Sequence, residues 1–123
     1  MCYISSSHDS TGSHNWKILG GGSGETIIQQ TKSDTGIFTV TQTDRFSQFS
    51  ISGLTLSYMG TNDTPSQPAI LSQNLVDAAN DYSPNFSAND VIVGCITPGR
   101  QVAFGYGFQL KNQKAVFIDK CNF

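Results

Sequence analysis

The chain has 123 residues and a formal net charge of -2, with 37% hydrophobic, 11% aromatic and 13% charged residues. This length suits one domain with a single core, and the aromatic content excludes a disordered tail. The seven basic residues form no run, which disfavours a nucleic-acid partner. No apolar stretch approaches the ~18 residues of a membrane-spanning helix, so a transmembrane segment is excluded.

Four short strands are predicted in the first third of the chain, at residues 2–6, 14–19, 25–31 and 36–43. A glycine-rich segment at 20–24 follows the second of them. We expect this segment to form either a wide hairpin loop or a tether that holds residues 1–19 loosely on a single β-rich domain. It lacks the Lys-Ser/Thr ending of a phosphate-binding loop, which disfavours a nucleotide site.

The residues on either side of Ser52 and Gly53 predict a β-hairpin. Large apolar side chains fall on odd positions up to Ile51 and on even positions from Leu54 onward. A two-residue turn at Ser52 and Gly53 would place all of these side chains on one face of two antiparallel strands.

The hydrophobic period changes after a loop rich in turn-forming residues at 59–68. Apolar residues then recur at helical spacing, as Ile70, Leu71, Leu75, Ala78, Ala79 and Tyr82. This spacing, with Pro68 at a first-turn position, predicts one α-helix over about residues 68–81.

The last third of the chain predicts a three-stranded antiparallel meander, with strands at 90–97, 101–110 and 114–121. The expected fold class is therefore mostly β. We expect an antiparallel β-sandwich or barrel of about eight strands, with the single helix packed against it.

The cysteine count is odd, with Cys2, Cys95 and Cys121. In the predicted meander, Cys95 and Cys121 lie two strands apart, at about 10 Å, beyond the ~7 Å that a disulfide can span. Any disulfide is therefore expected to use Cys2, with Cys121 as the favoured partner. The alternative is that the thiols remain free.

Three Asn-Asp pairs flank the predicted helix, and their carboxylates Asp63, Asp81 and Asp90 are the candidate metal ligands. If these loops converge, they offer the oxygen ligands that Ca²⁺ requires. The alternative is that the pairs cap the helix and open turns, because no loop holds the alternating carboxylates of a calcium motif. His8 and His14 suggest a transition-metal site or an acid–base pair, or else two surface histidines.

Trp16, flanked by Asn15 and Lys17, is the leading candidate for ligand binding, and Tyr58 belongs to the same candidate set. An exposed indole stacks well on a sugar ring, while an amide and an ammonium group hold its hydroxyls. The alternative is that Trp16 anchors the N-terminal strand in the core.

Patterns that carry catalysis are missing from the sequence. There is no Gly-x-Ser-x-Gly motif, and a single glutamate, Glu25, gives little support to paired-carboxylate chemistry. We therefore expect a lectin-like recognition module that binds carbohydrate or another cell-surface ligand. A secreted toxin or effector acting on membranes or host proteins is one alternative, and a small hydrolase or enzyme inhibitor is another. A secreted or extracellular location is expected, although Met1 also fits the natural start of a cytoplasmic chain.

Three short strings resemble known families. The segments 15–17 and 99–104 are similar to strings in fungal fruit-body lectins with an actinoporin-like sandwich, and 89–92 resembles a βγ-crystallin motif. These resemblances imply β-rich binding or calcium proteins, and they assign no residue roles.

Overall fold

The computed structural model describes residues 2–4, 8–12, 15–43, 48–59, 66–75, 85–94, 104, 106–113 and 115–123. These residues form ten strands: β1 (Cys2–Ile4), β2 (His8–Gly12), β3 (Trp16–Leu19), β4 (Ile27–Gln30), β5 (Phe38–Gln42), β6 (Gln48–Tyr58), β7 (Pro68–Asn74), β8 (Asn85–Gly94), β9 (Tyr106–Lys111) and β10 (Ala115–Asp119). The protein is mostly strand, as predicted. Across these described ranges there is no helix.

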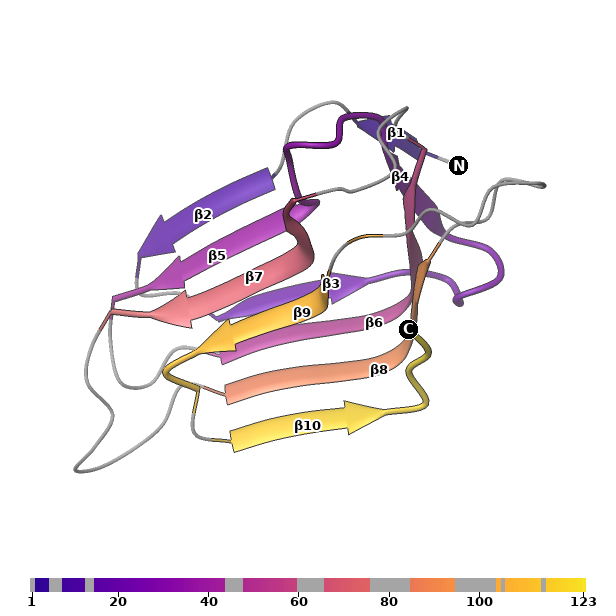
Figure 1. Ribbon diagram of the computed structural model, residues 1–123. Helices are drawn as coiled ribbons and strands as arrows, with labels where there is room; N and C mark the ends of the chain where they lie inside the picture. Colours follow the sequence, from indigo (N-terminus) through magenta and orange to yellow (C-terminus); the bar gives the residue numbers. More distant parts are fainter. Residues whose placement is uncertain are drawn as a thin grey trace.

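Every pairing between the described strands is parallel, so the predicted antiparallel sandwich or barrel is wrong. One sheet has the order β1-β4-β6-β8-β10, with β3 also paired to β6. The other sheet has the order β2-β5-β7-β9. Figure 1 shows the second sheet lying over the layer formed by β3, β6, β8 and β10.

Paired strands are one coil of the chain apart. Phe38 of β5 lies beside Ile70 of β7, and Phe49 of β6 lies beside Phe86 of β8. The chain therefore winds as a solenoid whose coils stack through parallel strand pairing, an arrangement in which each coil buries its apolar face on its neighbours.

A corner with left-handed backbone replaces the predicted hairpin. The first half of β6 pairs with β3 and the second half with β4, and between them Gly53 has φ of 70°. The equivalent residue of β8, Asp90, has φ of 53°, and Lys120, which follows β10, has φ of 51°. Such a residue bends the strand without reversing the direction of the chain. It also changes whether the odd-numbered or the even-numbered side chains point toward the core. Figure 1 shows the ribbons of β6 and β8 bending sharply part-way along the strand.

Residues 68–74 form strand β7, so the helix predicted over 68–81 is wrong in the part that can be compared. Ile70, Ser72 and Asn74 point inward and are buried, with the period of two that a strand requires. Two of these three inward positions are polar. The remaining apolar residues, Ile70, Leu71 and Leu75, therefore imitate helical spacing. Residues 76–81 of that prediction lie outside the described residues.

The predicted C-terminal meander is also wrong in its pairing. Strand β10 falls inside the predicted range 114–121, and β9 overlaps the predicted range 101–110 and ends one residue beyond it. However, β9 pairs with β7 and β10 pairs with β8, in different sheets. Cys95, one of the two thiols that the meander was expected to keep apart, lies outside the described residues.

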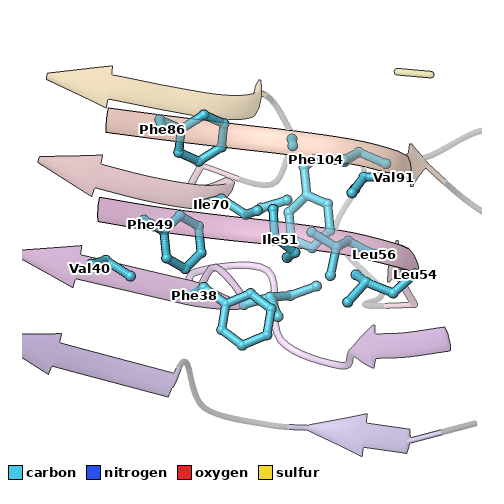
Figure 2. Packing of buried hydrophobic residues seen from close by; sticks show 14 of the residues in the cluster. Phe38, Val40, Phe49, Ile51, Leu54, Leu56, Ile70, Phe86, Val91 and Phe104 are labelled. Atoms are coloured by element: carbon cyan, nitrogen blue, oxygen red, sulfur yellow. The ribbon is translucent and has the colours of Figure 1, made fainter. Parts of the chain in front are cut away.

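The hydrophobic core lies between the two sheets (Figure 2) and is lined by large side chains such as Phe49, Ile51, Leu56 and Phe86. Full burial of one such side chain contributes about 1.5–3 kcal/mol. An aromatic run crosses successive coils, with ring centroids 5.5 Å apart for Phe49–Phe86 and 5.2 Å for Phe86–Phe108. It ends at Phe123, whose ring lies edge-on to Phe108 at 4.9 Å.

Candidate functional site

The outer side of the layer formed by β3, β6, β8 and β10 carries a regular array of mostly polar side chains. In each strand the alternate side chains point inward to the core, as Trp16, Phe49 and Phe86 do. The residues between them point outward. We call the outward residues of this layer the ladder face: Asn15, Lys17, Leu19, Gln48, Ser50, Ser52, Ser87, Asn89, Ala115, Phe117 and Asp119.

The strand register aligns the ladder face into columns. Lys17 lies beside Ser50, Ser50 beside Ser87, and Ser87 beside Phe117. The Ser87 hydroxyl donates to the Ser50 hydroxyl at 3.1 Å. Neighbouring strands are about 4.8 Å apart, so this column presents an ammonium group, two hydroxyls and an aromatic ring at regular spacing.

A second column adds amide and carboxylate groups. Leu19, Ser52, Asn89 and Asp119 lie side by side in register, and the Asn89 amide donates to the Asp119 carboxylate at 3.4 Å. At the other margin of the face, the Asn15 side-chain oxygen accepts from the backbone N–H of Gln48 at 3.2 Å. The face is thus flat, mostly uncharged and rich in hydrogen-bonding groups.

Phe117 is the exposed aromatic of this face, since 64% of its surface is accessible. Tyr106 on β9 and Phe123 are equally exposed at the same end of the solenoid. Apolar groups therefore gather on the coil that carries β9 and β10. Within the described ranges, no helix has the length and apolarity that crossing a lipid bilayer requires.

The binding residues predicted from the sequence divide between the core and the ladder face. Trp16 is half-buried against the core and its indole nitrogen is inaccessible, so it does not form an exposed platform. Its neighbours Asn15 and Lys17 are exposed on the ladder face. Tyr58 is only 1% exposed, and its ring lies 5.7 Å from that of Phe104. The aromatic contact that the sequence suggested at Trp16 is therefore offered by Phe117 instead.

The glycine-rich segment forms a loop over the corner of the solenoid. The backbone N–H groups of Gly20 and Gly22 donate to the carbonyls of Ser52 and Gly53, both at 2.8 Å. Ser23 then donates to Asp90 through its backbone N–H at 3.2 Å and its hydroxyl at 2.7 Å. The segment is neither a hairpin loop nor a loose tether, because these bonds join it to the two following coils.

The candidate metal ligands are not brought together by the described part of the chain. Both carboxylate oxygens of Asp90 accept hydrogen bonds from Ser23. Asp63, Asp81 and His14 lie outside the described residues, and His8 is on β2. Among the described residues, no three His, Cys, Asp or Glu side chains cluster as metal ligands.

The two described cysteines lie at opposite ends of the solenoid. Cys2 is on β1, Cys121 follows β10, and strands β4, β6 and β8 separate them. Both thiols are free. Several strand spacings of about 4.8 Å exceed the reach of a disulfide, so the favoured Cys2–Cys121 pair does not form within one chain.

The ladder face was missed in the sequence because its repeat is irregular. The strings Trp-Lys-Ile-Leu at 16–19, Phe-Ser-Ile-Ser at 49–52, Phe-Ser-Ala-Asn at 86–89 and Val-Phe-Ile-Asp at 116–119 share one pattern of inward and outward residues. They are separated by unequal numbers of residues, so no fixed period marks them. A search for the pattern itself, rather than for a period, would have aligned Phe117 with the two serines.

Comparison with known proteins finds no matching family model, no matching curated protein and no matching solved structure. The parallel pairing also differs from the lectin sandwich that the short string resemblances imply.

Proposed function

We propose that this protein is a non-catalytic recognition module that binds an uncharged, polyhydroxylated polymer, a polysaccharide, across the ladder face. The observation that supports this is the column of Lys17, Ser50, Ser87 and the exposed Phe117, aligned by strand register. A rigid sheet holds these groups in fixed positions, so binding orders few side chains and costs little conformational entropy.

The chemistry of the column suits a sugar chain better than a charged ligand. The exposed ring of Phe117 offers an apolar surface for the C–H face of one sugar ring. The hydroxyls of Ser50 and Ser87 offer donors and acceptors to the hydroxyls of the next one. Asp119, held by Asn89, accepts from sugar hydroxyls at the margin of the face.

Binding is tested first with a glycan array and then by calorimetry on the glycan that binds best. We expect Phe117→Ala to weaken binding about tenfold, because the stacking surface is lost. Ser87→Ala should weaken it by a smaller factor through loss of one hydrogen bond. Leu75→Ala is the matched control, since Leu75 is 65% exposed and directly follows β7, an inner strand of the other sheet.

Two results would contradict the proposal. One is the absence of binding to any glycan by the folded protein. The other is a Phe117→Ala variant that binds as tightly as the parent while the circular dichroism spectra of both are identical. Equal loss in the Leu75→Ala control would show that the effect is not specific to the ladder face.

A further inference from the structure

Both ends of the solenoid expose strand edges. At one end β1, β2 and β3 are outermost, each paired with a strand of the next coil on one side only, and at the other end β9 and β10 are outermost. No other strand in the described part of the chain pairs with the outer edges of these five strands. An unpaired edge offers backbone donors and acceptors to another chain.

The β10 end is unusually apolar for an exposed edge. Val116 and Ile118 occupy inward positions, yet 43% and 46% of their surfaces are accessible because no further coil covers them. Phe117 and Phe123 add two exposed rings to the same end. Natural sheets normally protect their edges with charged residues or short strands, whereas this edge carries three consecutive large apolar residues, Val116, Phe117 and Ile118.

The β3 end continues the columns that stop at the β10 end. Within one chain, the inward column runs from Trp16 through Phe49 and Phe86 to Val116. A second copy placed one strand spacing beyond β10 would put its Trp16 beside Val116 and its Ile18 beside Ile118. Both Trp16 and Ile18 are only half-buried in one molecule, so this contact buries apolar surface on both partners.

In the alignment that places Trp16 of the second copy beside Val116, the charged side chains on the outer faces of the two ends are also complementary. Lys17 of the second copy would lie beside the Phe117 ring and diagonally next to Asp119, which allows a cation–π contact and an ion pair. If two β10 ends met antiparallel about Phe117, Asp119 would face Ala115 and no opposite charges would meet. The charges therefore favour head-to-tail stacking.

We propose that the β10 end of one molecule binds the β3 end of a second copy, so that the ladder face continues across the interface. The interface joins unlike surfaces and leaves one free end of each kind, so it repeats and gives open chains rather than closed dimers. This inference is independent of the proposed sugar binding, because it depends on the edges of the solenoid.

Site-directed crosslinking tests the register. In a background with Cys2, Cys95 and Cys121 replaced by serine, Asn15→Cys and Ala115→Cys are made in separate proteins. Position 15 precedes Trp16, and position 115 precedes Val116, so the two thiols are neighbours only across a head-to-tail interface. We expect disulfide-linked dimers when the two proteins are mixed, and few when either is oxidised alone.

The controls separate head-to-tail stacking from other contacts. A Leu75→Cys protein, with its thiol away from both ends, should crosslink to neither. Dominant self-crosslinking of Ala115→Cys would overturn the proposal in favour of a like-end dimer. Crosslinking of the mixture no greater than that of the Leu75→Cys control would overturn it altogether.

Sedimentation velocity over a concentration series tests the energetics. The average mass of the parent should rise steadily with concentration, and Ile118→Lys should remain monomeric while Leu75→Lys behaves as the parent. Lys17→Glu or Asp119→Lys alone should weaken association about fivefold, and both together should restore it to within about twofold. A parent that is monomeric at every concentration yet binds phosphatidylcholine vesicles would assign the apolar end to lipid and overturn the proposal.

The two proposals fail separately. Ile118 points inward and does not belong to the ladder face, so the monomeric Ile118→Lys protein should retain any glycan binding of a single molecule. A parent protein that binds glycan but stays monomeric at every concentration would contradict only the stacking, and a parent protein that associates without binding any glycan would contradict only the recognition function.

Discussion

At the scale of single residues, the corner of the solenoid depends on glycines that bring two backbones together. A Cβ at Gly20 would collide with the carbonyl oxygen of Gly53, and a Cβ at Gly53 would lie 2.8 Å from the carbonyl oxygen of Gly20. Gly53 also has the positive φ that other residues adopt at a cost. The glycine-rich segment, which suggests flexibility in the sequence, is therefore a close-packed part of the molecule at these positions.

Gly20→Ala should lower the free energy of unfolding by at least about 2 kcal/mol, because the clash involves backbone that cannot move aside cheaply. Gly24→Ala is the matched control, since nothing lies within 4 Å of its added Cβ and its φ is not in the positive region. It should change stability by less than about 0.5 kcal/mol. Urea denaturation followed by circular dichroism measures both, and equal stabilities for the two variants would contradict the close approach.

Trp16 should behave as a structural residue and not as a ligand platform. Trp16→Ala should cost about 2 kcal/mol of stability through lost packing. Trp16→Phe should cost less than about 1.5 kcal/mol, since phenylalanines occupy the same column at Phe49 and Phe86. As the lone tryptophan of the chain, Trp16 also reports its own burial: strong quenching of its fluorescence by iodide would show that the ring is exposed and contradict this assignment.

At the scale of elements, polar side chains buried at the ends of strands explain why the sequence predicted a helix where β7 lies. Strand β5 ends at Gln42, which is 1% exposed, and β7 ends with Ser72 and Asn74 buried. Gln113, beyond β9, donates to the Gln42 side-chain oxygen at 3.1 Å and to the Ser72 hydroxyl at 3.4 Å. These polar groups occupy inward positions where a strand pattern is expected to have apolar residues. For this reason, the alternation of apolar and polar residues did not reveal β7 in the sequence.

This polar cluster makes a prediction about coupling. Gln113→Leu alone should cost about 1–3 kcal/mol, because it leaves the buried Gln42 amide without that hydrogen bond. Gln42→Leu with Gln113→Leu should cost less than the sum of the single changes, since the double variant leaves neither amide unbonded. A double-mutant cycle by urea denaturation measures the difference, and strictly additive losses would show that the two amides act independently.

At Ser52 and Gly53 the large apolar residues change from odd to even positions, and this change was a second source of error in predicting the strands. The hairpin predicted there is wrong, but its position coincides with the corner of the strand, where Gly53 has φ of 70°. A hairpin turn and a solenoid corner both use residues with positive φ. Both also switch the core-facing side chains from odd-numbered to even-numbered positions. Only the direction of the next segment distinguishes them, and that direction is set by partners one coil away.

At the scale of the whole molecule, the sequence predicted where most strands lie but not how they pair. The predicted segments at 25–31 and 36–43 contain β4 and β5, and 114–121 contains β10. Pairing depends on contacts between distant segments, and the unequal loops between coils removed the fixed period that marks a solenoid. Of the candidate site, Asn15 and Lys17 were identified, whereas Phe117 was not, because its place beside Ser87 exists only in the stacked coils.

The winding of the chain also has a consequence for how it folds. Paired residues are separated along the chain by 26 positions at the closest, Cys2 with Ile28, and by 38 at the most distant, Pro68 with Tyr106. No ladder between the described strands can close as a local hairpin, so each one requires the entropy loss of closing a long loop before it gains a contact. We therefore expect slow folding with a high contact order. Growth should proceed coil by coil from the long β6–β8 pair, whose nine paired positions form the most extensive ladder of the described chain.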